Sequence, residues 1–240
     1  MDLFVSDLHL SARRPETADL FIGFLAGTAR QAATLYILGD LFDYWLGDDG
    51  LDEPFAARVC KALAGLADSG TQIWFLPGNR DFLVGNNFAA TCGLHFLAEP
   101  SVRDVAGEPT LLLHGDTLCT DDRGYQTFRA TVRMPTWREQ FLAQPLATRR
   151  EYVEGLRKRS EAEKRVKPYE LMDTNAEAVA EAFRRYNVTS MIHGHTHRQA
   201  RHDLEIDGHH CRRWVLGDWE VTGNALACDA DGCRWLQIGP

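Results

Sequence analysis

MIHGHTH, residues 191–197, is a short apolar run that ends in a dense cluster of histidines. An apolar run followed by a polar cluster occurs four more times, in LFVSDLH (3–9), LYILGD (35–40), IWFLPGNRD (73–81) and LLLHGD (111–116). Short apolar runs bounded by turn residues indicate buried β-strands. Helical patterns, with apolar residues three and four positions apart, fall between these runs at residues 16–32 and 53–68. Alternating strands and helices predict an α/β fold with a largely parallel core sheet.

The pattern changes after residue 198. The runs HDLEIDG, HHCRRWVLGDW, NALACDADG and CRWLQIG are short and are separated by Gly or Asp-Gly turns. Such spacing is typical of antiparallel strands and hairpins. The chain is therefore predicted to form a two-sheet α/β sandwich.

Length and composition are those of a globular protein. The chain has 240 residues, of which 45% are hydrophobic and 25% charged, and this excludes disordered, collagen-like and fibrous classes. The first ten residues, MDLFVSDLHL, carry two aspartates and no basic residue, so we expect no signal peptide. No stretch approaches the roughly 18 uninterrupted apolar residues that a membrane-spanning helix needs.

The six cysteines are scattered along the chain without a Cys-x-x-Cys pair. We therefore expect reduced thiols, as in cytosolic proteins. Cys228 and Cys233 flank an Ala-Asp-Gly turn and could face each other across a hairpin. A disulfide or a zinc site at this pair is the less favoured alternative.

Charge is distributed unevenly. Taken alone, the net charge of −8 argues against DNA or other nucleic acid, anionic lipid or polyphosphate as a partner. Residues 123–168, however, hold 12 basic and 5 acidic residues, a net charge of +7, and the rest of the chain carries −15. The basic segment has helical periodicity and contains three prolines. We interpret it as a basic helical insertion between two strands of an acidic core, in which the charged face is either solvated or binds an anion.

Seven candidate metal ligands follow the predicted strands. They are Asp7, His9, Asp40, Asn79, His114, His195 and His197. The carboxyl ends of strands in open α/β sheets are where ligands bind. A mixed set of carboxylates, imidazoles and one amide suits Mn²⁺, Fe²⁺ or Zn²⁺, and seven ligands suffice for two ions that share one carboxylate.

The spacing within two of the motifs supports this interpretation. Side chains two positions apart on an extended segment point the same way. We therefore expect Asp7 and His9 to reach one ion, and the same reasoning applies to His195 and His197. A single such residue is more often a turn or capping residue, but five clusters on one predicted edge favour a metal site.

The ordered motifs D-x-H, G-D, G-N-R-D, H-G-D and G-H-x-H resemble those of the calcineurin-like metallophosphoesterase superfamily. The resemblance implies a four-layer αββα sandwich. It also implies one metal on Asp7, His9, Asp40 and His197, and a second metal on Asp40, Asn79, His114 and His195. Asp40 would bridge the two ions.

One departure from that pattern concerns the position after Asn79. The superfamily usually has a histidine there, commonly viewed as the acid that protonates an alkoxide leaving group, whereas this chain has Arg80. Arginine remains charged and cannot serve as that acid, but it can clamp phosphate oxygens. We therefore predict a leaving group that needs no proton, such as a phosphate, and cleavage of a pyrophosphate bond.

The segments GNRD, LGDLFDYWLGDD (38–49) and LLLHGDTLCTDD (111–122) are similar to those of the UDP-2,3-diacylglucosamine pyrophosphatase family. That family hydrolyses its lipid substrate to UMP and 2,3-diacylglucosamine 1-phosphate in lipid A synthesis. The resemblance implies two Mn²⁺ ions, and catalytic roles for Asn79, Arg80 and His195. It implies substrate contacts at Asn79, Arg80, Asp122, Ser160, Lys164, Lys167 and His195.

The same resemblance implies a division of the chain and a location in the cell. Residues 1–122 and 169–240 would form the metallophosphoesterase core, and residues 123–168 a helical cap. Apolar side chains in the cap would pack together or line a channel for acyl chains. We expect reversible, peripheral attachment to the anionic, cytoplasmic face of the inner membrane.

The expected mechanism follows two-metal logic, in which a metal-activated hydroxide attacks the uridylyl phosphorus in line. Asp48, Asp49, Asp116 and His193 are interpreted as supporting or turn residues rather than ligands. Two alternatives remain open at this point. One is a soluble nucleotide pyrophosphatase with the same core, and the other is a non-enzymatic binding scaffold on a degenerate phosphoesterase fold.

Overall fold

Two β-sheets form the centre of the structure, a computed structural model that describes residues 1–164 and 173–239, with side chains described outside residues 159–164. The first sheet has the strand order β11-β10-β1-β2-β3-β4. Its strands are β1 (Asp2–Val5), β2 (Thr34–Ile37), β3 (Gln72–Phe75), β4 (His95–Phe96), β10 (Gly223–Asp229) and β11 (Gly232–Ile238). Strands β1 to β4 are parallel, and β10 and β11 are antiparallel additions at one edge.

The second sheet has the strand order β5-β6-β7-β9-β8. Its strands are β5 (Ser101–Val105), β6 (Glu108–Leu112), β7 (Ser190–His193), β8 (Ala200–Ile206) and β9 (His209–Val215). Strands β6, β7 and β9 are parallel to one another, and β5 and β8 pair antiparallel at the two edges. The hairpins predicted after residue 198 are confirmed as β8–β9 and β10–β11.

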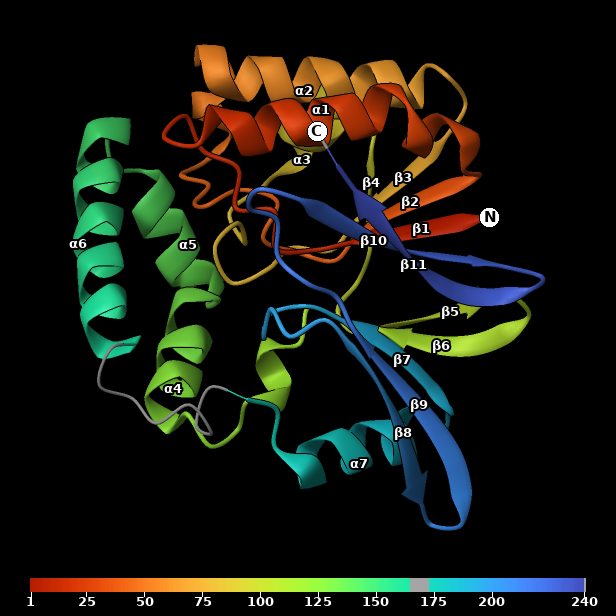
Figure 1. The fold of residues 1–240 in the computed structure, drawn as a ribbon. Coiled ribbons are helices and arrows are strands. Elements are labelled where there is room, and N and C mark those ends of the chain that lie inside the picture. Colours follow the sequence, from red (N-terminus) through yellow and green to blue (C-terminus); the bar gives the residue numbers. More distant parts are fainter. Residues whose placement is uncertain (165–172, 240) are drawn as a thin grey trace.

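Helices cover the outer faces of both sheets (Figure 1). Helices α1 (Pro15–Ala26), α2 (Pro54–Ala67) and α3 (Asn86–Cys92) pack on the first sheet, and α7 (Ala176–Tyr186) packs on the second. Between the sheets lies a third apolar layer that includes Phe4, Ile192 and Trp214. These layers confirm the predicted four-layer αββα sandwich.

The helix predicted over residues 16–32 is shorter than expected. Helix α1 begins at Pro15, whose fixed φ suits the first helical turn, and ends at Ala26. Gly27 follows, and residues Thr28–Gln31 form a separate 3-10 turn, η1. Glycine destabilises the interior of a helix, and the α-helix ends just before Gly27. The apolar periodicity of the sequence nevertheless continues beyond this point.

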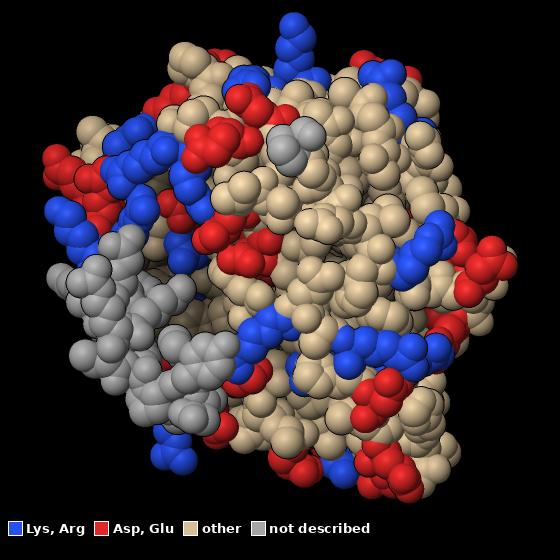
Figure 2. Space-filling view, in the orientation of Figure 1, with Lys and Arg blue, Asp and Glu red and all other residues tan. Residues whose placement is uncertain are grey.

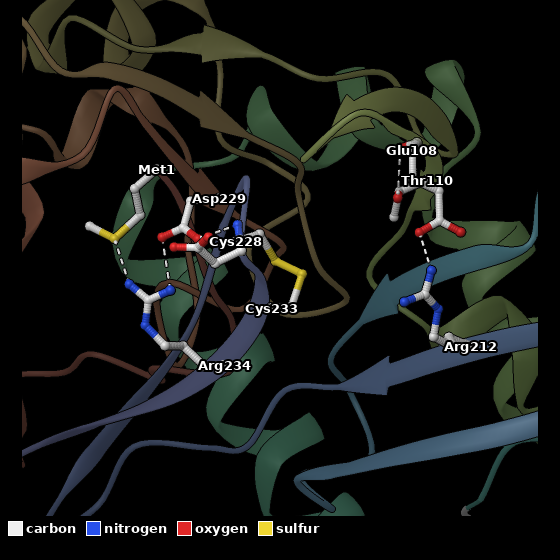
Figure 3. Close-up of a disulfide and its surroundings, with 9 residues drawn as sticks. Met1, Glu108, Thr110, Arg212, Cys228, Asp229, Cys233 and Arg234 are labelled. Atoms are coloured by element: carbon white, nitrogen blue, oxygen red, sulfur yellow. Dashed lines mark hydrogen bonds and ion pairs between the residues drawn. A yellow bond between two sulfur atoms is a disulfide. The ribbon is translucent and has the colours of Figure 1, made fainter.

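Cys228 and Cys233 form a disulfide across the β10–β11 hairpin (Figure 3). The expectation that all six cysteines are reduced is therefore wrong for this pair, whereas Cys60, Cys92, Cys119 and Cys211 are free and buried. The two half-cystines stand directly opposite each other in the antiparallel register, with Cα atoms 4.1 Å apart. The antiparallel register of the hairpin brings the sulfur atoms together, although the sequence contains no Cys-x-x-Cys pair.

The cap insertion contains three helices, which lie beside the ends of the two sheets (Figure 1). They are α4 (Arg123–Val132), α5 (Pro135–Leu142) and α6 (Leu146–Lys164). The Trp137 ring stacks on Phe141 at 4.8 Å and approaches the core residue Phe82 at 6.2 Å. Apolar side chains of the cap thus pack against one another and against the core. Residues 165–168 of the predicted insertion lie outside the described residues.

Arginines of the cap form ion pairs with acids of the core. The pairs are Arg129 with Glu99 and Asp116, Arg133 with Glu99, Arg149 with Asp49, Arg150 with Glu53, and Arg157 with Asp43. Figure 2 shows basic and acidic side chains interspersed on the side of the molecule where the cap lies. Much of the opposite charge of the two segments is therefore paired where the cap contacts the core.

Arg149 anchors α6 and generates a stability prediction. Its side chain is 1% exposed, donates to the carbonyls of Leu46 and Gln144, and pairs with Asp49. Arg149→Met should lower the free energy of unfolding by about 1–3 kcal/mol, because it leaves a buried carbonyl without its donor. The measurement is urea denaturation followed by tryptophan fluorescence. The control is Arg150→Met, which removes an exposed pair and should cost less than about 1 kcal/mol; equal losses would contradict the anchor role.

Candidate active site

The loops after β1, β2, β3, β6 and β7 bring the seven candidate ligands together at one edge of the sandwich. The residues are Asp7, His9, Asp40, Asn79, His114, His195 and His197. All seven follow the carboxyl end of a strand, because the parallel strands of both sheets end at this edge. The structure leaves none of the seven away from the cluster.

One group of polar atoms surrounds Asp7. His197 Nε2 lies 3.3 Å from Asp7 Oδ1 and 3.1 Å from His9 Nε2. His9 Nδ1 lies 3.8 Å from Asp40 Oδ2. Asp7, His9 and Asp40 are buried, so their polar atoms face one another with little access to water.

A second group surrounds Asn79. Its Oδ1 lies 2.9 Å from His114 Nε2 and 2.9 Å from His195 Nδ1. His114 Nε2 is also 3.7 Å from Asp40 Oδ1. The two oxygens of Asp40 therefore face the two groups, one each.

The backbone at five of these residues is left-handed. The φ angles are 56° at Asp7, 48° at His9, 53° at Asp40, 70° at His195 and 60° at His197. The expectation that Asp7 and His9 share an extended segment is therefore wrong, and so is the same expectation for His195 and His197. Each left-handed residue turns the chain sharply just after a strand. Non-glycine residues in this region cost about 1–3 kcal/mol each, and such strain is characteristic of functional sites.

Two glycines allow the loops to approach this closely. A Cβ on Gly78 would overlap Asp40 Oδ1, and a Cβ on Gly194 would overlap Ser6 Oγ and Asp7 Oδ2. Neither contact can be relieved by movement of a flexible side-chain end, because both carboxylates are buried. Glycine is required at both positions for steric reasons.

The arrangement fits two bound cations. Asp7 Oδ1 and His9 Nδ1 are buried and have no hydrogen-bond partner among the described residues, which is costly unless another group satisfies them. The separations between ligand atoms, 2.9 to 3.9 Å, match neighbouring ligands that each bind an ion at about 2.0–2.2 Å. Asp7, His9, Asp40 and His197 would hold one ion. Asp40, Asn79, His114 and His195 would hold the other.

Hydrogen bonds to the far side of two imidazoles orient the rings. His114 Nδ1 donates to the carbonyl of Leu38 at 2.9 Å, and His197 Nδ1 to Asp218 Oδ2 at 3.1 Å. Each bond leaves Nε2 facing the cluster, the usual arrangement of a histidine that binds a metal. Sequence reasoning missed Asp218, although LGD (216–218) repeats the apolar-Gly-Asp motif of residues 38–40.

Asp81 is a second residue that sequence reasoning missed. Its fully buried carboxylate accepts hydrogen bonds from the backbone N–H groups of Asp40, Leu41, Phe42 and Gly78. It thereby ties the loop after β2 to the loop after β3. The signal was its place in the GNRD motif, whose last residue follows the candidate ligand Asn79 by two positions.

Arg80 lies at the margin of the cluster. Its Nη1 donates to Asp43 Oδ1 at 2.8 Å, its Nε lies 3.8 Å from Asp40 Oδ2, and its guanidinium sits over the ring of Tyr44 at 5.2 Å. Burial lowers and the carboxylate of Asp40 raises the pKa of Arg80, and the net shift is upward. Arg80 therefore stays charged and donates no proton. Asp43 was not singled out from the sequence.

The structure describes some, but not all, of the substrate residues that the resemblance implies. Asp122 caps α4 by accepting a hydrogen bond from the Tyr125 N–H at 3.0 Å. Ser160 and Lys164 belong to α6, but their side chains are outside the described part of the structure. Lys167 lies outside the described residues. Their substrate roles stay predictions.

A groove of about 230 Å³ runs between α6 and the loops after β1 and β2. Its apolar lining includes Leu10, Phe42, Trp45, Phe55, Leu146 and Val153. Its charged lining includes Asp43, the partner of Arg80, and Arg157 of the cap, 3.3 Å from Asp43 Oδ2. The groove lining is therefore mixed, with apolar side chains and charged side chains that include the Asp43 partner of Arg80.

The sequence pattern of the calcineurin-like phosphoesterase family matches residues 3–199, most of the chain and all seven candidate ligands. The chain belongs to the calcineurin-like phosphoesterase family. A solved structure, a dimetal phosphatase from Danio rerio, is 12% identical with a TM-score of 0.49, and the match covers 99% of this chain and 98% of that chain.

More similar relatives lie within one group of that family. A protein of Aromatoleum aromaticum named UDP-2,3-diacylglucosamine hydrolase is 50% identical, over 99% of this chain and 94% of its own length. Proteins of the same name from Pseudomonas aeruginosa and Stenotrophomonas maltophilia are both 47% identical. The match covers 97% of this chain and 96% of the relative in the first case, and 96% and 95% in the second. The family resemblance read from the motifs is thereby confirmed.

The imidazoles of the cluster differ in proton affinity. Burial lowers the pKa of His195 to about 3, with the nearby His114 acting in the same direction. Burial would also lower the pKa of His114, but Asp40 and Asp7 raise it to about 9. Likewise, the carboxylates of Asp218 and Asp7, which lie 3.1 and 3.3 Å from the ring nitrogens of His197, overcome burial and raise the pKa of His197 to about 10. In the ion-free protein at pH 7, His114 and His197 are therefore protonated.

Metal binding at pH 7 should consequently release protons, because an imidazole must be neutral to bind a cation. We expect about two protons per fully loaded chain, one each from His114 and His197. Acidification should weaken binding, since the protons then compete more strongly. The measurement is Mn²⁺ titration calorimetry in buffers of different ionisation enthalpy. Asp218→Asn should reduce the release, and a release of zero would contradict the assigned ligand set.

Proposed function

We propose that this chain hydrolyses the pyrophosphate bond of UDP-2,3-diacylglucosamine to UMP and 2,3-diacylglucosamine 1-phosphate, using two Mn²⁺ ions, in lipid A synthesis. The observation that carries the proposal is the extent of the sequence similarity to the relatives named UDP-2,3-diacylglucosamine hydrolase. Their similarity extends over nearly the whole chain, the cap included. A soluble nucleotide pyrophosphatase would need the seven candidate metal ligands but not the cap.

The orphaned polar atoms of Asp7 and His9 support the fit of these residues to bound metal. When bound, the ions supply a water of lowered pKa and neutralise charge on the phosphate. The two carboxylate oxygens of Asp40 face the two groups of candidate ligands, so Asp40 would bind both ions. Asn79 and His195 lie side by side at the second position, where they would contact the phosphate as well.

Arg80 would act on the diphosphate. Its charge is permanent, and its guanidinium, held by Asp43 and the Tyr44 ring, lies at the margin of the cluster with Nε 3.8 Å from Asp40 Oδ2. A guanidinium can hold two phosphate oxygens at once and stabilise the charge that develops on them. The leaving group, a phosphate monoester with a second pKa near 6, needs no proton at neutral pH.

The cap would bind the lipid part of the substrate. In this proposal residues 1–122 and 169–240 form the catalytic core and residues 123–168 the cap, with Asp122, Ser160, Lys164 and Lys167 at the sugar and phosphate. The apolar groove under α6 would take an acyl chain. Phe42 and Trp45 of the core and Leu146 and Val153 of the cap line this groove.

We also propose peripheral attachment to the cytoplasmic face of the inner membrane. Of the six exposed large hydrophobic residues in the described chain, four belong to the cap: Phe128, Met134, Leu142 and Tyr152. No helix in the described residues is long and apolar enough to span a bilayer. Flotation with vesicles tests the proposal. Binding to anionic vesicles that weakens with salt supports it, and failure to float with them contradicts it.

Product analysis tests the proposed reaction. The Mn²⁺-supplemented protein should convert UDP-2,3-diacylglucosamine to UMP and the 1-phosphate, with UDP-glucose cleaved far more slowly because it lacks acyl chains. Mass spectrometry identifies both products. Reaction in ¹⁸O-water should label UMP rather than the sugar phosphate, since attack is expected at the uridylyl phosphorus. Equal rates on both substrates would favour a general nucleotide pyrophosphatase.

Arg80→Ala tests the role of the guanidinium. It should lower kcat by about 10²- to 10³-fold, as expected when a charge-stabilising donor is lost. Bound Mn²⁺, measured by mass spectrometry, should change little because Arg80 is not one of the seven ligands. Loss of metal in proportion to activity would contradict this role. Arg184→Ala serves as the control, because this arginine of α7 pairs with Glu177 and Asp207, away from both the cluster and the groove.

A further inference from the structure

Helix α4, the first helix of the cap, presents a polar face to the candidate metal edge. Tyr125, Arg129 and Arg133 are spaced four positions apart and therefore lie on one side of the helix. Gln126 beside them donates to the carbonyls of Asp116 and Cys119, at 2.8 and 3.0 Å. Helix α4 is thus attached to the loop after β6 by several side chains.

Arg133 reaches the loop that carries Asn79. Its Nη2 donates to the carbonyl of Gly78 at 2.9 Å, one residue before Asn79. Its guanidinium also lies over the Phe82 ring at 5.6 Å. Arg133 therefore holds both ends of the GNRD turn.

Arg129 reaches the loop that carries His114, through two buried acids. Its Nε lies 2.6 Å from Asp116 Oδ2 and its Nη2 3.3 Å from Glu99 Oε2. The other oxygen of Glu99 accepts a hydrogen bond from the His114 N–H at 3.0 Å. The backbone position of His114 therefore depends on a carboxylate that Arg129 neutralises.

Tyr125 completes the contacts. Its hydroxyl donates to Asp116 Oδ2 at 2.5 Å, and its ring lies 5.9 Å from the His195 ring. Asn79, His114 and His195, the three ligands of the second ion other than Asp40, are thus all adjacent to a contact of α4. Among the described residues, no hydrogen bond or ion pair joins α4 to the loops that carry Asp7, His9 and His197.

We propose that Arg129 and Arg133 are positioning residues for the second metal position, so that the cap controls the occupancy of one ion and not the other. The inference rests on the proposed two-ion function. Its physical basis is that Glu99 and Asp116 have side chains only 10% and 0% exposed. Removing a cationic partner leaves a buried carboxylate uncompensated, and the group must then move or draw in another charge. His114 and the loop of Asn79 are the groups that would move.

The experiment counts bound ions rather than turnover. Wild type, Arg129→Gln, Arg133→Gln and the control Arg150→Gln are titrated with Mn²⁺ and followed by electron paramagnetic resonance and mass spectrometry. Wild type and Arg150→Gln should bind two ions with the spectrum of an exchange-coupled pair. The two α4 variants should keep one ion and bind the other about 10- to 100-fold more weakly, with a spectrum of isolated Mn²⁺.

Other outcomes separate the two proposals. Two tightly bound ions in both α4 variants, or equal loss of both ions from a folded variant, would overturn the positioning role alone. Fewer than two ions in the wild type would overturn the proposed function and this inference with it. Circular dichroism reports folding. If Arg129→Gln fails to fold, Glu99→Met decides, because it removes the oxygen that accepts the hydrogen bond from the His114 N–H while α4 keeps its Asp116 contacts. It should weaken binding of the same ion, and normal binding would overturn the inference.

Discussion

The carboxylate of Asp40 is the constraint around which the site is built. It is buried, and one oxygen faces His9 at 3.8 Å while the other faces His114 at 3.7 Å. Burial raises the pKa of Asp40, and the buried Asp7 nearby adds a second negative charge. Two acids in one dry space require positive charge around them. The imidazoles, the guanidinium of Arg80 and the two cation positions are all arranged to provide it.

Much of this arrangement could be predicted from the sequence, because the apolar runs identify the strands and the strand ends identify the edge where polar residues meet. The contributions of Asp81 and Asp218 could not, since each acts by hydrogen bonds to groups far away in the chain. The left-handed backbone at His9 and His197 could not either, because tertiary contacts rather than local preference impose it. Sheet register likewise decided the pairing of Cys228 with Cys233.

In the folded structure, basic residues of the cap form ion pairs with acidic residues of the core. Arg149 and Arg157 of α6 pair with Asp49 and Asp43, and α4 pairs with Glu99. These charges attach the cap to the loops of the active site before any anion arrives. A helical insertion can therefore be held over a metal edge with modest apolar contact, and the same arginines that fasten it also influence the loops beneath it.

The first strand of the chain owes its central place to the last hairpin. Strand β1, which leads directly to Asp7 and His9, pairs with β2 on one side and with β10 on the other, and Trp219 N–H donates to the carbonyl of Asp7. During synthesis from the N-terminus, β1 is made first, and more than 200 further residues are added before β10, its second neighbour, is made. A ribosome-bound fragment that ends before β10 would therefore contain all seven candidate ligands but lack one of the two strands that pair with β1.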